Sequence, residues 1–205
     1  MSRIGLLILA AGASTRLGQP KQLLTIHGKP LLRCMAERAI AANADPVGIV
    51  LGAQAARIRP SLIDLPTHLI HNQAWATGMA SSIRCGLQTI LTVAPDLDAI
   101  ILLVCDQPFV STPLIQQLMT ASQSSHAPII ASAYADTLGV PALFHKILFP
   151  ELLTLRGDGG AKSLIRRHAR DCHGIPFAAG AIDLDTPEHL EILASLVRQP
   201  PITSG

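Results

Sequence analysis

The sequence predicts a three-layer α/β domain, in which helices cover both faces of a mostly parallel, Rossmann-like sheet. Strand and helix patterns alternate along most of the 205 residues, which is the order that parallel strands joined by helices produce. The chain is 49% hydrophobic but only 3% aromatic, and this composition suits helices packed on a buried sheet. Because no repeat or linker interrupts the chain, we expect one domain over residues 1–198 and a frayed tail over residues 199–205.

In the first half of the chain, short apolar runs predict buried strands, and apolar residues at helical spacing predict the helices between them. The first run ends in a loop, residues 12–21, that is rich in Gly, Ser, Thr and Pro. In such sheets ligands bind beyond the carboxyl ends of the strands, which directs attention to the loops after residues 9, 71 and 104. The expected elements, in chain order, are a strand at 4–9, a helix at 30–42, strands at 47–51 and 67–71, a helix at 78–91 and a strand at 99–104.

The pattern is less regular in the second half. Between residues 134 and 160 it loosens, and several turn signals occur there. Thr186, Pro187 and Glu188 are typical of the start of a final helix that runs to about Val197. The expected elements are a helix at 113–122, a strand at 128–133, a helix at 161–168, a short extended piece at 182–185 and that final helix.

Charge and composition exclude several kinds of partner. A net charge of +2 is too small to indicate a nucleic acid or an anionic membrane, and the few aromatic residues argue against a protein that stacks single-stranded bases. The sequence has no run of about 18 apolar residues and no signal-peptide cleavage site, so we expect a cytoplasmic protein. No C-x-x-C pair occurs among the four cysteines, which favours reduced and mostly buried thiols: Cys34, Cys85, Cys105 and Cys172.

The loop after the first expected strand has the composition of a phosphate-binding loop. Gly12 and Ser14 are small, so a ligand can approach the backbone N–H groups closely. Arg16 and Lys21 add two cations that can neutralise a triphosphate. The spacing matches neither the Walker loop nor the G-x-G-x-x-G loop of dinucleotide-binding proteins. An ordinary turn is the alternative interpretation of this stretch.

Two further loops place polar residues near strand ends. Gly78 precedes a helix that begins close to Ser81 and Ser82, which indicates either an anion site at a helix N-terminus or an ordinary capped helix. Asp106 follows the strand expected at 99–104. A carboxylate that faces phosphates there is a natural Mg²⁺ ligand, whereas the alternative is an aspartate in the turn before Pro108.

Taken together, these stretches resemble the motifs of a known enzyme family. Residues 9–21, LAAGASTRLGQPK, resemble the signature L-A-A-G-x-S-x-R-x-G-x-P-K of nucleotidyltransferases with a glycosyltransferase-A-like fold, the nucleotide-diphospho-sugar transferase type. Residues 72–82 resemble N-x-x-W-x-x-G-M-x-x-S, and residues 105–108 resemble C/G-D-x-P, as in the molybdenum cofactor cytidylyltransferase branch of MobA-like nucleotidyltransferases. Residues 157–162 are similar to its G-D-x-G-A-R segment, with Lys162 in place of Arg, and residues 183–189 to its D-x-D-T-P-E-D, with His189 in place of Asp. The resemblance extends from residue 4 to about residue 196.

The resemblance implies a role for each matching residue. Asp106 would bind Mg²⁺, or Mn²⁺ in its place, and either Asp183 or Asp185 would be the second carboxylate ligand; Asp183 is favoured, because Asp185 is more typical of a helix N-cap. The implied catalytic residues are Lys21, Arg16 and Asp106, and the implied nucleotide-binding residues are Leu9, Ala10, Ala11, Gly12, Ser14, Arg16, Lys21, Asn72, Gly78 and Ser81. The implied acceptor-binding residues are Ser82, Gly157, Asp158 and Lys162, although a Gly-rich turn capped by Asp158 is the alternative for that segment.

The same resemblance implies transfer of CMP from CTP to a phosphorylated acceptor, molybdopterin, with release of pyrophosphate. Ala11 stands where related guanylyltransferases have Gly, and its side chain would narrow the base pocket to fit a pyrimidine. The alternatives are a guanylyltransferase, a transferase for an isoprenoid or sugar phosphate, and a non-catalytic nucleotide-binding chaperone that matures a molybdoenzyme. We therefore expect CTP or another NTP and a phosphorylated small molecule as partners, with a molybdoenzyme as a further one, and neither nucleic acid nor membrane.

Overall fold

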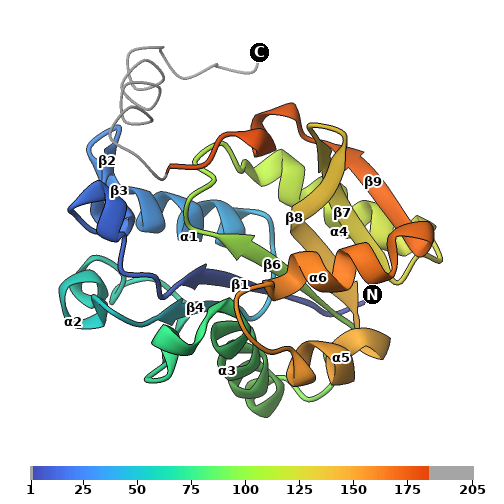
Figure 1. The fold of residues 1–205 in the computed structure, drawn as a ribbon, viewed down its shortest axis with the longest axis horizontal. Coiled ribbons are helices and arrows are strands. Elements are labelled where there is room, and N and C mark those ends of the chain that lie inside the picture. Colours follow the sequence, from blue (N-terminus) through green and yellow to red (C-terminus); the bar gives the residue numbers. More distant parts are fainter. Residues whose placement is uncertain (1, 185–205) are drawn as a thin grey trace.

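The computed structural model describes residues 2–184, which form a seven-stranded sheet covered by helices on both faces (Figure 1). The strand order is β5-β4-β1-β6-β8-β7-β9. All neighbouring strands are parallel except β8, which is antiparallel to both β6 and β7. The prediction of a three-layer, mostly parallel α/β sheet is therefore confirmed.

The central strands are buried along their whole length, as their continuous apolar runs predict. The strands of the sheet are β1 (Ile4–Ala10), β4 (Val47–Leu51), β5 (His68–His71), β6 (Ala99–Val104), β7 (Ile129–Tyr134), β8 (Thr137–His145) and β9 (Cys172–Pro176). A separate small hairpin consists of β2 (Thr25–Ile26) and β3 (Lys29–Pro30).

Alternate side chains of β1 enter two different cores. Leu6 and Ile8 pack in the core beneath α1 (Leu31–Ala41) and α4 (Thr112–Ser124). Leu7 and Leu9 point the other way, into the core with α3 (Met79–Val93), α5 (Phe149–Thr154) and α6 (Gly160–Arg167). Figure 1 shows α1 and α4 on the opposite side of the sheet from α3 and α5.

Short helices complete the described part of the chain, and none of its helices is long and apolar enough to cross a bilayer. They are α2 (Ala55–Ile58) and the 3₁₀ helices η1 (Thr15–Leu17), η2 (Lys21–Leu23), η3 (Arg59–Ser61), η4 (Trp75–Thr77), η5 (Lys146–Leu148), η6 (Ala169–Asp171) and η7 (Ala178–Ala181).

The order of the strands fixes where a ligand can bind. From β1 the chain moves outward through β4 to β5 and then returns to β6, on the other side of β1. At such a reversal the loops after the two central strands diverge and leave a crevice beyond their carboxyl ends. The loop after β1 and the residues after β6 therefore face the same crevice.

The structure also contains elements that the sequence patterns did not predict. Residues 134–160, where only turn signals were apparent, hold β8 and α5, and residues 172–176 form β9. β8 contains Gly139 and Pro141, and β9 contains Gly174 and Pro176, which are rare in strands. Residues 182–184 form no strand, although the backbone of Ile182 is extended. The final helix predicted from Thr186 lies outside the described residues, as does Asp185.

Candidate active site at the carboxyl edge of the sheet

The loop after β1 folds around a small cavity of about 150 Å³. Ser14 has a left-handed backbone with φ of 54°, and Gly18 follows with φ of 67°, so the loop turns sharply around η1. A Cβ added to Gly12 would meet nothing within 4 Å, so this side of the loop is open to a ligand. The cavity is lined by Gly12, Ser14, Thr15, Arg16, Leu17 and Lys21. The polar residues of the predicted phosphate loop are thus brought together.

Gln22 holds this loop in shape, a role that the sequence patterns did not reveal. Its side chain is 1% exposed, and its Nε2 donates to the carbonyl oxygens of Ala10, at 2.8 Å, and Gly12, at 3.1 Å. The hydroxyl oxygen of Ser14 accepts a hydrogen bond from the backbone N–H of Lys21 at 3.1 Å, which closes the loop at its other end. A glutamine directly after the cationic end of a Gly-rich loop was the available signal.

Asp106 lies across the crevice from this loop. Its Oδ2 is 3.4 Å from Nζ of Lys21, so the second residue after β6 meets the last residue of the predicted phosphate loop. Its Oδ1 is buried and has no hydrogen-bond partner within residues 2–184. A buried carboxylate oxygen that lacks a partner among these residues is costly to maintain, and a bound cation is one group that would satisfy it.

Asp183 approaches Asp106 through a backbone contact. The N–H of Leu184 donates to the carbonyl oxygen of Asp106 at 2.8 Å, and this bond brings the segment that carries Asp183 to the end of β6. Both carboxylates line one cavity of about 230 Å³. No group of three or more His, Cys, Asp or Glu residues suited to a metal occurs in the described part of the chain. Two carboxylates still fit Mg²⁺, because this ion is usually held by one or two carboxylates together with substrate phosphates and water.

This cavity, called the inner cavity below, also contains the predicted acceptor-binding residues Asp158 and Lys162. Its lining comes from six separate segments of the chain, whose meeting the sequence could not show. The lining residues are Leu9, Met79, Val104, Asp106, Gln107, Tyr134, Gly139, Val140, Asp158, Gly159, Ala161, Lys162 and Asp183.

The start of α3 packs directly on the Gly-rich turn before α6. Gly78 has φ of +105°, and a Cβ there would lie 2.5 Å from Oδ1 of Asp158. The N–H of Ala80 donates to the carbonyl oxygen of Gly157 at 3.1 Å. A segment predicted to bind nucleotide therefore supports a segment predicted to bind the acceptor, and only glycine fits at position 78.

Asn72, Ser81 and Ser82 also lie together, but their side chains bond one another. All three are buried, with exposures of 3%, 4% and 4%. Nδ2 of Asn72 donates to the hydroxyl oxygen of Ser81 at 2.8 Å and to that of Ser82 at 3.0 Å, and its Oδ1 accepts from the N–H of Ala74 at 3.0 Å. This network fixes the turn between β5 and α3. A direct contact of these three side chains with a ligand stays a prediction.

The last two residues of β1 and the residue after them are buried. Ala11 is 7% exposed, its carbonyl oxygen accepts from the N–H of Ala53 at 3.1 Å, and it belongs to the core on the α3 side of the sheet. Leu9 and Ala10 are equally enclosed, at 7% and 3%. A Cβ on Gly52 would lie 2.6 Å from the carbonyl oxygen of Ala11, so the two loops are closely packed. Leu9 still lines the inner cavity, and a direct contact of Ala10 or Ala11 with a nucleotide stays a prediction.

Tyr134 and Gln107 also line the inner cavity, and the sequence patterns assigned neither of them to a site. Gln107 is 2% exposed and donates from Nε2 to the carbonyl oxygen of Gly180 at 3.0 Å. Burial raises the pKa of the Tyr134 phenol, and the nearby negative charges of Asp183 and Asp106 raise that pKa further. The phenol therefore stays protonated and neutral beside the carboxylates at neutral pH.

The chain is similar to known proteins over most of its length. The family model for the MobA-like NTP transferase domain matches residues 6–172. Nicotine blue oxidoreductase of Paenarthrobacter nicotinovorans is 32% identical over 171 residues, which cover 78% of this chain and 80% of that protein. Molybdenum cofactor guanylyltransferase of Xanthomonas euvesicatoria pv. vesicatoria is 28% identical over 188 residues, or 88% of this chain and 89% of that protein.

Solved structures show the same similarity. The crystal structure of Rv0371c from Mycobacterium tuberculosis H37Rv superposes with a TM-score of 0.82 at 28% identity and covers 95% of this chain and 98% of its own. A crystal structure of Rv0371c in complex with manganese aligns with a TM-score of 0.78 at 26% identity and covers 95% and 99% of the two chains.

Proposed function

We propose that this chain, which belongs to the MobA-like NTP transferase family, transfers CMP from CTP to the phosphate of molybdopterin and releases pyrophosphate. The observation that carries this proposal is the arrangement around Asp106. Its Oδ1, which has no partner among residues 2–184, and the ammonium group of Lys21 lie at the crevice between the phosphate loop and the inner cavity. A triphosphate in the loop and an acceptor in the inner cavity would meet there.

The reaction is a displacement at the α-phosphorus of the nucleotide. An oxygen of the acceptor phosphate forms a new P–O bond, the bond between the α-phosphorus and the bridging oxygen breaks, and pyrophosphate leaves with that electron pair. A phosphate monoester is already largely ionised at pH 7, so no general base is required. The protein has to align two anions and to neutralise charge in the transition state.

The residues of the chain can divide this work as follows. Backbone N–H groups of residues 11–14 hold the leaving phosphates, and Arg16 and Lys21 neutralise the charge that develops on them. Lys162 and Asp158 orient the acceptor in the inner cavity. Asp106 and Asp183 would hold Mg²⁺ or Mn²⁺, which supplies charge neutralisation and alignment of the phosphate oxygens when it is bound.

The choice of base has two candidates. Ala11, which stands where the related guanylyltransferases carry Gly, favours CTP. GTP is the second candidate, because this chain is 28% identical to the molybdenum cofactor guanylyltransferase of Xanthomonas over most of both chains. Two further alternatives remain from the sequence, namely transfer to an isoprenoid or sugar phosphate and nucleotide binding by a non-catalytic chaperone. The assay described next distinguishes them from transfer to molybdopterin.

Pyrophosphate release tests these proposals together. The assay measures release from each of the four NTPs with Mg²⁺, with and without molybdenum-loaded molybdopterin. We expect release with CTP and molybdopterin, and its loss when EDTA removes the metal. If GTP and not CTP supports release in the presence of molybdopterin, the guanylyl assignment replaces the cytidylyl one. Binding of CTP without any release, with every acceptor offered, would support the chaperone instead.

A further inference from the structure

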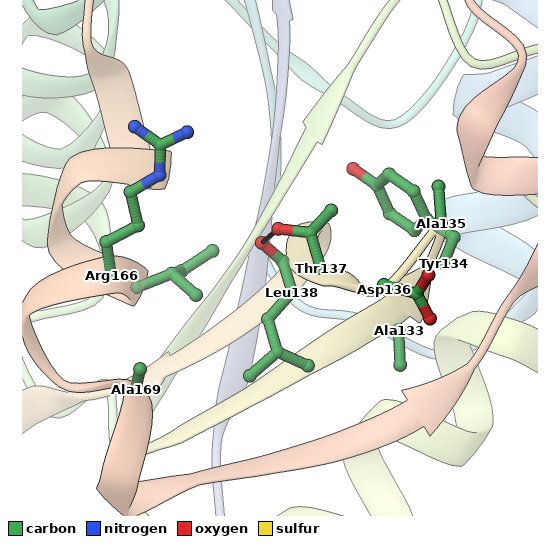
Figure 2. Close-up of a pocket in the computed structure, with 9 residues that line it drawn as sticks. Ala133, Tyr134, Ala135, Asp136, Thr137, Leu138, Arg166 and Ala169 are labelled. Atoms are coloured by element: carbon green, nitrogen blue, oxygen red, sulfur yellow. Dashed lines mark hydrogen bonds between the residues drawn. The ribbon is translucent and has the colours of Figure 1, made fainter.

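A larger hollow lies next to the inner cavity, between α6 and the turn that joins β7 to β8 (Figure 2). Its volume is about 610 Å³. Figure 2 shows Arg166 on one side of this outer hollow and Tyr134 on the other. It is lined by Ala133, Tyr134, Ala135, Asp136, Thr137, Leu138, Ile165, Arg166 and Ala169.

Helix α6 lines both hollows with consecutive turns. Lys162 lies in the inner cavity, and Arg166, four residues later, lies in the outer hollow. Residues four apart share one face of a helix and are separated by about 6 Å along its axis, so both cations face the same groove.

Strand β8 forms the opposite wall of this groove in the same way. Gly139 and Val140 line the inner cavity, and the residues just before them, Thr137 and Leu138, line the outer hollow. Both walls therefore run without a break from one hollow into the next.

Tyr134 lines both hollows and is held in place. Its hydroxyl donates to the carbonyl oxygen of Val140 at 3.2 Å, and its ring meets the ring of Phe177 edge-on, with centroids 6.4 Å apart. A Cβ on Gly139 or on Gly180 would collide with the tyrosine side chain. The ring is thus a fixed part of the wall that the two hollows share.

Size separates the tasks of the two hollows. Binding sites for whole small molecules usually measure about 300–1,000 Å³. The inner cavity, at about 230 Å³, is below this range and has room for a phosphate and a few further atoms, whereas the outer hollow, at about 610 Å³, falls well inside it.

We propose that the outer hollow binds the body of the phosphorylated acceptor, while its phosphate lies in the inner cavity. This proposal rests on the proposed function. It defines the acceptor as a molecule whose part beyond the phosphate is larger than a single sugar or a short polyol and carries an electron-rich group that Arg166 can bind. Within residues 2–184 Arg166 forms no ion pair, whereas its neighbour Arg167 donates to Oε2 of Glu151 at 3.0 Å.

The two neighbouring arginines provide a matched experiment. In pyrophosphate-release assays with CTP, Arg166→Ala should raise the KM for molybdenum-loaded molybdopterin by about 10-fold or more, since a charge-assisted hydrogen bond is lost. Its KM for CTP should change by less than about 2-fold. Arg167→Ala removes the same charge from the same helix, at a residue paired with Glu151, and should leave both constants unchanged. A bulky side chain on the exposed rim, Ala169→Trp, should raise the molybdopterin KM again.

The outcomes separate the two proposals. If the wild type releases no pyrophosphate with molybdopterin, the proposed function fails, and the assignment of the acceptor fails with it. If the wild type does release pyrophosphate but Arg166→Ala and Ala169→Trp match Arg167→Ala in their molybdopterin KM, the outer hollow does not bind the acceptor and the proposed function stands. A rise confined to these two variants supports the groove.

Discussion

Nζ of Lys21 lies 3.4 Å from Oδ2 of Asp106, although 85 positions separate the two residues in the chain. The side chains are 14% and 26% exposed, so each is partly shielded from water and still open to the crevice. The pair joins the phosphate loop after β1 to the end of β6. A metal ion would compete with Lys21 for the carboxylate of Asp106, and a triphosphate would compete with Asp106 for the ammonium group of Lys21.

Asp106→Ala should nearly abolish nucleotidyl transfer while the fold survives. The reason is the loss of a metal ligand, and Oδ1 of Asp106 has no protein partner within the described residues whose loss would destabilise the fold. The measurements are pyrophosphate release and the urea midpoint of unfolding. Asp171→Ala, which removes an exposed carboxylate elsewhere, serves as control. Activity like that of the wild type would remove Asp106 from the mechanism.

Lys21→Ala should lower kcat by on the order of 10²-fold, because a cation that stabilises the transition state is lost. Lys21→Arg should restore little, since a planar guanidinium cannot take the position of an ammonium group. Lys29→Ala is the control, because Lys29 is exposed and pairs with Glu37. If Lys21→Ala changes only the KM for the nucleotide, Lys21 binds the ground state and its proposed role is wrong.

Gln22→Leu should weaken nucleotide binding indirectly, because Gln22 holds the shape of the loop. The carbonyl oxygens of Ala10 and Gly12 would lose their donor, at a cost of roughly 1–3 kcal/mol in the free energy of unfolding. We expect a lower urea midpoint and a higher KM for the NTP. Gln19→Leu alters an exposed glutamine of the same loop and should change neither. An unchanged NTP KM in a destabilised Gln22→Leu protein would limit Gln22 to stability.

Gly78→Ala should disturb the acceptor site through the turn before α6. The added Cβ would fall 2.5 Å from Oδ1 of Asp158, at a φ of +105° that alanine rarely adopts. The acceptor KM should therefore rise together with a loss of stability. Gly28→Ala is a useful comparison, because that glycine also has a positive φ, +79°, but its Cβ would meet nothing within 4 Å. It should cost stability alone; an equal rise in acceptor KM for both variants would argue against a specific contact.

Ala11→Gly tests the choice of base. The substitution removes a methyl group and frees the backbone, and one methyl group is typically worth about 1–3 kcal/mol of discrimination. We expect the ratio of kcat/KM for CTP to that for GTP to fall without reversing. Because Ala11 is only 7% exposed, some loss of stability should accompany this change. A wild type that already prefers GTP would overturn the cytidylyl proposal, and an unchanged ratio would show that Ala11 does not shape the base pocket.

The sequence predicted the elements whose patterns are local. The strands at 47–51 and 99–104 have the same bounds in the structure, because a continuous apolar run depends only on the residues within it. Four polar residues of the loop at 12–21 likewise line one cavity, namely Ser14, Thr15, Arg16 and Lys21. β8 and β9 were missed because their Gly and Pro residues are tolerated only through pairing with strands distant in the chain.

By itself, the sequence determined the α/β class, the Gly-rich loop with two cations after the first strand and the position of Asp106 just after a buried strand, since each follows from the order of residues along a short stretch. Only the tertiary structure decided that Gly78 supports Asp158, that Gln22 holds the phosphate loop, and that Tyr134 lies between two hollows. Those relationships join residues that do not stand at helical or strand spacing in the sequence, so no periodic pattern reveals them. The placement of Gly78 against Asp158 and of Tyr134 between the hollows depends on β8, which inserts antiparallel between β6 and β7 and packs against α6, and such long-range packing is set by the whole chain at once.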